Sequence, residues 1–449
     1  MTRLCLLALS ISALAYAQIP LGTTPDSPPP NETWNWFYQA TSIGDYHGAF
    51  RAPYTGPFSL QPTAERDVSL TTTLFFGFRP FANTQIYFDP EIAGGRGFSG
   101  VNGVANAPNG ELPRVASATP KPYIARVYLT QDFGFGSQRE TVESDANQLG
   151  GTRPMTRYSI TIGRFTVSDF FDNNAFTHDP RTQFLGWGVM YNGAWDYPAD
   201  TRGYTWGWVH EFHTRRYSFR YGSAAEPRVA NGLRFDRRLF RDRGDMFEAE
   251  RRWSLHARDG AIRLLSYFNH TNSGSYAEAL AISRQTGQRP DVAAASQTGR
   301  LKYGFGISAD QQLTPDLGIF GRLGWNDGKT ESFAFTSIDR LSTLGVSLKG
   351  PRWHRPHDVA ASEITISGLS AVHAQYLAAG GYDFLIGDGR LRYGTENIWE
   401  SYYSAQLLHG FTATYDLQFI VNPAYNQDRG PVWVHSLRLH LEFGKPDFR

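Results

Sequence analysis

The chain has 449 residues, of which 19% are charged and 14% aromatic, and 45 are glycine. Its formal net charge of +1 argues against nucleic acid as a partner. Beyond the N-terminal segment, no stretch of the sequence approaches ~18 uninterrupted apolar residues. This excludes a helical membrane anchor but not a β-barrel.

The N-terminus has the features of a secretory signal peptide, predicted over residues 1–17. Arg3 precedes an apolar run from Leu4 to Leu14, and Ala15-Tyr16-Ala17 forms a small-residue cleavage site. The single cysteine, Cys5, lies inside this segment, so the mature chain is predicted to have no disulfide. Residues 18–33 are proline-rich and predict a stiff periplasmic leader, and residues 34–449 predict one domain.

Alternating apolar and polar residues predict strands joined by short turns along the rest of the chain. The clearest predicted pairs are 68–79 with 84–88, 204–212 with 217–221, 253–257 with 262–268 around Asp259-Gly260, 303–307 with 317–325, 382–386 with 391–393 around Gly387-Asp388-Gly389, and 411–421 with the last strand.

Long polar connections separate these hairpins, and they are predicted over 90–120, 134–155, 222–246, 270–300 and 350–374. A short helix is expected inside one of them, over 276–282. Short turns alternating with long loops are typical of an outer-membrane barrel with short periplasmic turns and long extracellular loops. The fold class predicted is therefore all-β, a transmembrane antiparallel β-barrel of about sixteen strands.

The last strand, 430–443, shows the pattern most clearly. Trp433, Leu437 and Leu441 fall on one face, and Ser436 and Arg438 fall on the other. An apolar face toward lipid and a charged face toward a wet lumen suit a transmembrane barrel, although a surface strand of a soluble β-sandwich has the same alternation.

The predicted lumen-facing residues are mixed in sign and rich in amides and aromatic rings. They include Arg126, Tyr128, Thr130, Arg263, Tyr267, Asn269, Arg322, Asn326, Thr412, Thr414, Asp416, Gln418 and Asn422. Ion-selective pores tend toward rings of one sign, so this lining favours a neutral, polyhydroxylated solute.

The densest group of polar and aromatic residues runs from Asp169 to Trp187, directly after a predicted strand at 156–165. In a barrel, such a segment could fold inward and narrow the pore with polar groups and an aromatic face that replace the hydration shell of a sugar. An external loop held by its own Asx turns explains the composition equally well.

Motifs for catalysis, cofactors or metals are weak. Gly95-Arg96-Gly97-Phe98-Ser99-Gly100 matches GxGxxG but is not followed by a helix. His210 and His213 lie on a predicted strand and face opposite sides, and there is no GxSxG sequence. We predict no cofactor, no metal site and no catalytic residue.

Several stretches together resemble the carbohydrate-selective porin family (OprB type) of bacterial outer membranes. They are Tyr87-Phe-Asp-Pro-Glu91, the glycine-rich 94–103, 163–174, Trp195-Asp-Tyr-Pro198, Tyr376-Leu-Ala-Ala-Gly-Gly381, Glu396-Asn-Ile-Trp-Glu400-Ser-Tyr-Tyr403, Asn422-Pro-Ala-Tyr-Asn426-Gln-Asp-Arg-Gly-Pro431, and the final strand through Phe443. Family members tend to end at the terminal aromatic residue, whereas six residues follow Phe443 here.

The resemblance implies a sixteen-stranded outer-membrane barrel that admits mono- or small oligosaccharides by passive diffusion through a charged and aromatic constriction. The matching stretches, together with the dense segment, give these candidate constriction residues: Glu91, Arg96, Arg126, Arg164, Asp169, Asp172, Asn173, Arg181 and Trp187. Expected partners are carbohydrate solutes, outer-membrane lipid and the barrel assembly machinery, and the sequence leaves homo-oligomerisation open. The alternatives are a general or other-solute porin, an enzyme embedded in a barrel, and a secreted soluble β-rich sugar-binding protein.

Overall fold

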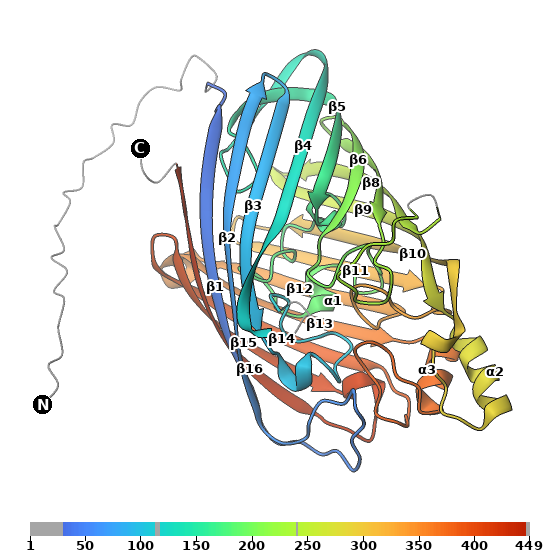
Figure 1. The fold of residues 1–449 in the computed structure, drawn as a ribbon. Coiled ribbons are helices and arrows are strands. Elements are labelled where there is room, and N and C mark those ends of the chain that lie inside the picture. Colours follow the sequence, from blue (N-terminus) through green and yellow to red (C-terminus); the bar gives the residue numbers. More distant parts are fainter. Residues whose placement is uncertain (1–29, 113–116, 239–240, 446–449) are drawn as a thin grey trace, which may run out of the picture.

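The computed structural model describes residues 30–112, 117–238 and 241–445. Within these ranges, sixteen strands form one closed antiparallel barrel in which each strand pairs with its neighbours in sequence (Figure 1). The strands are β1 Trp34–His47, β2 Glu65–Phe81, β3 Thr84–Gly95, β4 Ser117–Val142, β5 Gly151–Phe165, β6 Thr205–His213, β7 Tyr217–Ala225, β8 Arg243–Leu255, β9 Arg258–Gly274, β10 Ser296–Gln312, β11 Leu317–Asn326, β12 Arg340–Gly350, β13 Arg355–Gly368, β14 Glu396–Leu408, β15 Phe411–Val421 and β16 Val432–Gly444. The predicted signal peptide and most of the predicted leader lie outside the described residues.

The barrel closes where the first strand meets the last. β1 pairs with β16 in a continuous antiparallel register that places Tyr38 opposite Phe443 and Thr41 opposite His440. The rings of Tyr38 and Phe443 lie 5.2 Å apart. The sequence-based prediction of a final strand ending at Phe443 is therefore confirmed, with one further residue, Gly444, in the strand.

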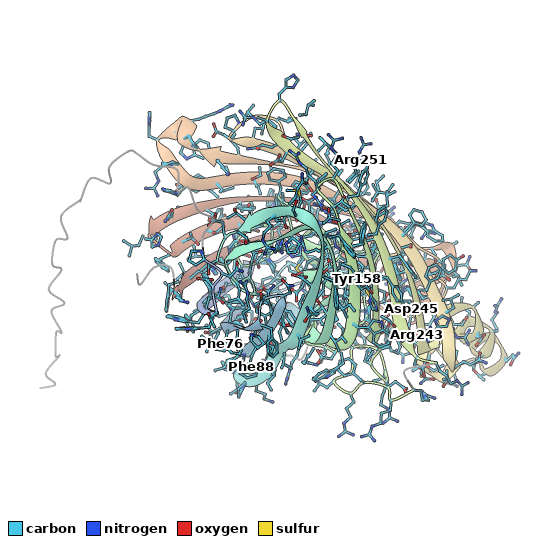
Figure 2. All side chains as sticks on the ribbon, turned by 90° about the horizontal axis from the view of Figure 1, so that it is seen from above. Phe76, Phe88, Tyr158, Arg243, Asp245 and Arg251 are labelled. Carbon is cyan, nitrogen blue, oxygen red and sulfur yellow. The ribbon has the colours of Figure 1, made fainter. Side chains whose placement is uncertain are left out.

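The two faces of the strands differ as their alternation predicts. On β16, Trp433 and Leu437 are about half exposed on the outside, whereas Arg438 on the inside is fully buried. Phe76 of β2 and Phe88 of β3 are neighbours on the outer surface (Figure 2). Outward apolar side chains and an inward polar face are what a strand needs between lipid and a polar lumen.

The connections alternate in length around the barrel. Those that follow odd-numbered strands are long, and those that follow even-numbered strands are short. The long connections are 48–64, 96–116, 166–204, 226–242, 275–295, 327–339, 369–395 and 422–431; the short connections are 82–83, 143–150, 214–216, 256–257, 313–316, 351–354 and 409–410. All the long connections therefore lie at one end of the barrel, at the bottom of Figure 1.

The predicted turn at Asp259-Gly260 is wrong by three residues. Leu255 pairs directly with Arg258, so the turn consists of His256 and Ala257. Both turn residues have positive φ, 50° and 58°, which a two-residue hairpin turn of type I′ requires. Asp259 and Gly260 instead continue the ladder of β9.

The predicted hairpin at 382–393 is also wrong, because this segment belongs to the long connection 369–395. Its alternating pattern breaks at Leu385 and Ile386, which are neighbours and are both completely buried. A strand with one solvated face cannot bury two successive side chains in this way, because they point to opposite faces.

Two of the predicted long connections contain strands. Most of 134–155 belongs to β4 and β5, and only 143–150 connects them, at the end of the barrel that carries the short turns. In 350–374, a short turn at 351–354 is followed by β13. The predicted long connections near 90–120, 222–246 and 270–300 are confirmed.

The helices lie in the long connections. They are α1 Trp187–Met190, α2 Tyr276–Thr286 and α3 Ala371–Ala378. The helix predicted at 276–282 is α2, which begins where the Ser275 hydroxyl accepts a hydrogen bond from the backbone N–H of Glu278. In the described part of the chain, no helix combines the length and the apolar character needed to cross a membrane.

Candidate pore constriction

The 166–204 connection, which contains the Asp169–Trp187 segment, folds into the barrel. Arg322 of β11 holds it from the opposite wall: its guanidinium lies 3.1 Å from the Asp172 carboxylate and donates to the carbonyl of Thr177 over 2.9 Å. Arg438 of β16 donates to the carbonyl of Gln183 over 2.6 Å. These contacts cross the lumen. Buried arginines on distant strands therefore hold the 166–204 loop in its inward position.

A carboxylate and an aromatic cluster complete the attachment of this loop. The Glu400 side chain on β14 accepts hydrogen bonds from the backbone N–H groups of Leu185 and Gly186, over 2.5 and 3.1 Å. The ring of Phe184 packs between Phe320 of β11 and Tyr402 of β14. The loop therefore fills the lumen beside β11–β16, which we call the closed side.

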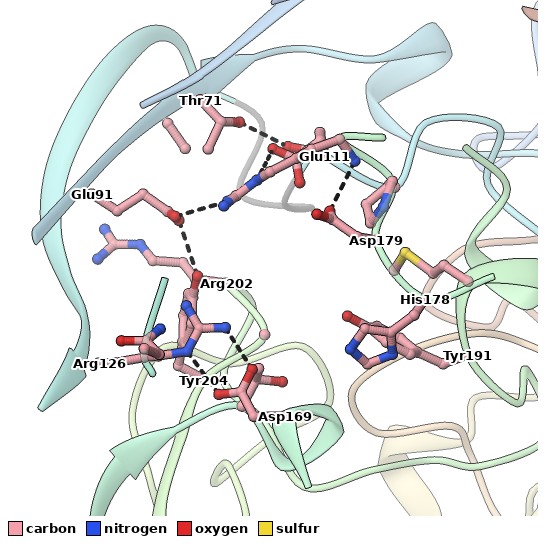
Figure 3. A pocket seen from close by; sticks show the side chains of 18 of the residues that line it. Thr71, Glu91, Glu111, Arg126, Asp169, His178, Asp179, Tyr191, Arg202 and Tyr204 are labelled. Carbon is pink, nitrogen blue, oxygen red and sulfur yellow. Dashed lines mark hydrogen bonds and ion pairs between the residues drawn. The ribbon is translucent and has the colours of Figure 1, made fainter. Parts of the chain in front are cut away.

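On the opposite side, beside β2–β4, a cavity of about 540 Å³ remains between the loop and the barrel wall (Figure 3). We call this the open side. Its lining combines the inward faces of β2–β4 with the 166–204 loop and with residues 110–112 of the neighbouring long connection. The polar lining residues labelled in Figure 3 are Thr71, Glu91, Glu111, Arg126, Asp169, His178, Asp179, Tyr191, Arg202 and Tyr204.

Glu91 of β3 is the central acceptor in this lining. Its carboxylate accepts hydrogen bonds from the hydroxyls of Thr73 over 2.6 Å and Tyr204 over 3.2 Å, and from the hydroxyl of Tyr123. The Arg181 guanidinium, which comes from the inward loop, lies 3.0 Å from the same carboxylate. Glu91 thus connects β2 and β4 to the 166–204 loop, at Arg181 and at Tyr204.

Arg126 of β4 forms the second charged group of the wall. It binds the Asp169 carboxylate through two parallel hydrogen bonds of 2.7 and 2.6 Å, and it lies 3.4 Å from Asp89. A paired geometry of this kind fixes both side chains in orientation. The guanidinium carbon also lies 5.4 Å from the centre of the Tyr204 ring.

Arg181 connects the loop tip to a second acid, Glu111, at 3.0 Å. Burial lowers the pKa of Arg181, but Glu111 and Glu91 outweigh burial and hold this pKa well above its usual value. Burial raises the pKa of Glu111, and Arg181 opposes that rise. Arg181 therefore remains charged, and it bridges two carboxylates at the edge of the cavity.

Two aromatic rings, Trp187 and Phe335, line the same cavity as these charged groups. The indole of Trp187 stacks on the ring of Phe335 with centroids 5.6 Å apart and planes 9° apart. Its Nε1–H donates to the carbonyl of Asn109 over 2.8 Å, which fixes the ring. Such a surface presents an apolar plane to the C–H face of a sugar, while the charged groups supply hydrogen-bond partners for its hydroxyls.

Six of the nine candidate constriction residues line the cavity: Glu91, Arg126, Asp169, Asn173, Arg181 and Trp187. The other three lie elsewhere. Arg96 is exposed at the end of β3, where its backbone N–H donates to Asp67. Arg164 is paired with Asp200 at 2.7 Å, and Asp172 binds Arg322 on the closed side.

Sequence reasoning missed five residues of this lining in particular: Glu111, Tyr123, Asp179, Arg202 and Tyr204. Asp179 stood inside the dense segment, next to Arg181, and that position could have suggested it. Glu111 and Arg202 lie in irregular segments, and Tyr204 ends one. Tyr123 lies on β4, where a shift in register between Arg126 and Ile124 reverses the simple alternation. Within the described residues the Arg202 guanidinium has no carboxylate partner, and it lies 4.3 Å from the centre of the Tyr123 ring.

In the ranges that the structure covers, no group of three histidine, cysteine, aspartate or glutamate side chains is arranged to hold a metal ion. Burial lowers the pKa of His178, which lines the cavity, so this histidine is uncharged near neutral pH.

Comparison with known families decides the identity of this barrel. The family model described as carbohydrate-selective porin, OprB family, matches residues 83–443. The chain belongs to this family. As an OprB-family protein, it is an outer-membrane β-barrel for the passive, selective diffusion of carbohydrates, and the soluble sugar-binding alternative is wrong.

Among solved structures, the high-pH structure of Pseudomonas putida OprB is similar to this chain, with a TM-score of 0.68 and 15% sequence identity. The match covers 91% of this chain and 94% of that one, and it shows that the two share a fold. Acinetobacter baumannii OccAB1 is more distant, with a TM-score of 0.47, 9% identity, and coverage of 91% and 96% of the two chains. Among curated proteins, no match to this sequence is found.

Proposed function

We propose that the 540 Å³ cavity is the point at which this porin selects carbohydrates, and that its solutes are mono- or small oligosaccharides. The observation that carries the proposal is the lining: fixed carboxylate–guanidinium pairs and a fixed tryptophan ring border the same cavity. Paired charges offer donors and acceptors without a large net charge of either sign, which favours neutral hydroxyl-rich solutes. The selecting residues in this proposal are Glu91, Arg126, Asp169, Asn173, Arg181 and Trp187.

The same proposal extends to placement and partners. The long connections face the exterior and the short ones face the periplasm, as in other outer-membrane barrels. Residues 1–17 are a signal peptide, residues 18–33 a leader, and residues 34–449 one barrel domain inserted into lipid by the barrel assembly machinery, with homo-oligomerisation as one further state. The protein has no enzymatic activity, and transport needs no energy source.

The proposal is tested by conductance in planar bilayers, with the salt current titrated by glucose and by maltose-type sugars. A saturable fall in current is expected. Replacing Arg126 by alanine removes the group that orients Asp169, and we expect the half-blocking sugar concentration to rise about tenfold, the equivalent of one charged hydrogen bond. Arg96→Ala is the matched control, because Arg96 lies outside the cavity.

Two results would count against the proposal. An open channel whose current is unaffected by any sugar would leave a general or other-solute porin. Sugar block that is equally strong in the wild type, Arg126→Ala and Arg96→Ala would place the selecting site away from this cavity.

A further inference from the structure

The hairpin of β4 and β5 extends well beyond the rest of the barrel wall. β4 pairs with β3 only as far as Gln131, opposite Thr84, and its last eleven residues pair with β5 alone. The ladder is interrupted between Phe135 and Arg139, where Gly136 has a φ of 74°. The hairpin bends there and arches over the end of the barrel that carries the short turns, at the top of Figure 1.

The connection at the tip of this hairpin, 143–150, enters the lumen from that end. The Asn35 side chain on β1 donates to the carbonyl of Gln148 over 2.8 Å. The Asn147 side chain donates over 2.8 Å to Asp89, the same carboxylate that lies beside Arg126. Leu149 is 2% exposed and is packed among the buried side chains of the lumen.

The segment that precedes β1 holds the tip in place. The backbone N–H of Glu32 donates to the carbonyl of Gly150 over 3.0 Å. Its carboxylate accepts from the Ser144 hydroxyl over 2.7 Å and from the N–H of Gly150 over 2.9 Å. The tip is therefore fastened on both sides, by residues 32–35 and by the inward face of β3.

The tip stands between two hollows of the lumen. Beside the 540 Å³ cavity lies a second one of about 230 Å³, lined by Arg79, Arg157 and other inward residues of β2–β6. The two hollows share five lining residues: Tyr128, Asn147, Gln148, Asp169 and Phe170. The two hollows therefore adjoin at these shared residues.

We propose that the tip of the β4–β5 hairpin forms a second constriction of the pore, at Asn147 and Gln148, through which solute leaves the 540 Å³ cavity. This proposal rests on the proposed function for the identity of the solute, but the narrowing of the pore at the tip does not depend on that identity. The two amide side chains are uncharged. Each donates one hydrogen bond within the protein, Asn147 to Asp89 and Gln148 to the Glu143 carbonyl, and each NH2 group has a second N–H for a solute hydroxyl. The pore is thus narrowed from both ends, by the 166–204 loop and by this hairpin.

Cysteine modification tests this proposal directly, because the chain contains a single cysteine, Cys5, which is replaced by serine for the experiment. Gln148→Cys places a thiol on the tip. Gln138→Cys places one on the exposed outer part of the same hairpin and is the matched control. Each protein is reconstituted in planar bilayers in salt alone, and a bulky methanethiosulfonate reagent is added. The extent of labelling is verified by mass spectrometry.

We expect labelling of Gln148→Cys to lower the single-channel conductance to about half or less, because an added group narrows the passage, and labelling of Gln138→Cys to leave it unchanged. As a second variant, replacing residues 145–148 by two glycines should raise the conductance. Complete labelling of Gln148→Cys without a change in conductance would overturn the proposal, as would a shortened tip that conducts like the wild type.

The sugar titration separates this proposal from the proposed function. If labelled Gln148→Cys conducts less but sugars never block the wild type, the second constriction stands and carbohydrate selection at the first cavity fails. If sugars block the wild type and labelling has no effect, the reverse holds.

Discussion

Inward-facing arginines have different roles on the two sides of the lumen. On the open side, Arg126 and Arg181 pair with carboxylates at the edge of a cavity. On the closed side, Arg322 and Arg438 are completely buried and bind the backbone of the inward loop. An inward-facing arginine of a barrel strand therefore does not by itself indicate a solute-binding residue.

The difference lies in what the charged groups contact. The backbone carbonyls that accept hydrogen bonds from Arg322 and Arg438 belong to the inward loop. Those two guanidinium groups therefore complete the hydrogen bonding of a folded loop. The groups of the open side bind one another and still border free space. The closed side holds the inward loop in place, and the open side leaves the cavity that we propose as the selecting site.

The largest effect is expected when the closed side loses an anchor. Arg322→Ala leaves the buried carboxylate of Asp172 without its cation, which should lower the free energy of unfolding by about 3–5 kcal/mol. Urea denaturation of protein in lipid vesicles measures this change. The variant should also conduct more, with a noisier current, because the 166–204 loop is released. Stability equal to that of the wild type would show that the loop does not depend on this pair.

A pH-dependent effect is expected at His373 of α3, which is fully buried between Asp339 at 3.0 Å and Asp383 at 3.2 Å. Burial lowers its pKa, but the two carboxylates outweigh burial and raise it from 6.5 to about 9. A raised pKa stabilises the fold fully below pH 6.5, and the contribution is lost as the pH rises through about 9.

Between pH 6.5 and 10, the free energy of unfolding should therefore fall by roughly 1–3 kcal/mol at this site. Urea denaturation at a series of pH values provides the measurement. His373→Gln is the control, because it cannot titrate, and its stability should vary less over the same range. An identical pH dependence in both proteins would contradict the assignment.

On the open side, Arg181→Ala should change sugar block more than stability. It releases the loop tip from Glu91 and Glu111, and we expect about a tenfold change in the half-blocking sugar concentration. Arg181→Lys keeps the charge but not the forked geometry that reaches both acids, so an intermediate value is expected. Sugar titration of the current distinguishes the three proteins, and equal values would remove Arg181 from the site.

The smallest effect is expected at Arg153, which lines the smaller hollow and is paired with Glu140 at 2.6 Å. Both side chains are about one third exposed. Exposed ion pairs contribute little because water screens them, so Arg153→Ala should cost below about 1 kcal/mol. Urea denaturation that showed a loss as large as that of Arg322→Ala would erase the distinction between the two sides.

Much of the barrel was predictable because each strand carries its own signal. Alternation placed Phe76 outside and Arg322 inside, and the final strand was correct in face, while its predicted bounds, 430–443, differ slightly from Val432–Gly444. Turns were less certain, since a turn depends on local backbone geometry. Asp259-Gly260 has the favoured composition, yet the positive φ angles belong to His256 and Ala257.

The placement of side chains in loops was only partly predictable, because contacts distant in sequence decide it. Asp169 and Asp172 are three residues apart in the same dense segment, but one binds Arg126 on the open side and the other binds Arg322 on the closed side. Glu111 and Arg202 reach the cavity from irregular segments. No periodic pattern exists in such segments to indicate a direction.

The seam between β1 and β16 has a consequence for how the molecule forms. Thr41 and His440 touch across it although they are 399 residues apart in the chain. Contacts of such separation form slowly, and here the first strand has no permanent partner on that edge until the last strand exists. Until the two strands pair, β1 has unpaired backbone hydrogen-bonding groups along that edge. Closure of this seam therefore removes the two remaining open edges of the sheet, one on β1 and one on β16, and with them the sites at which another chain could pair.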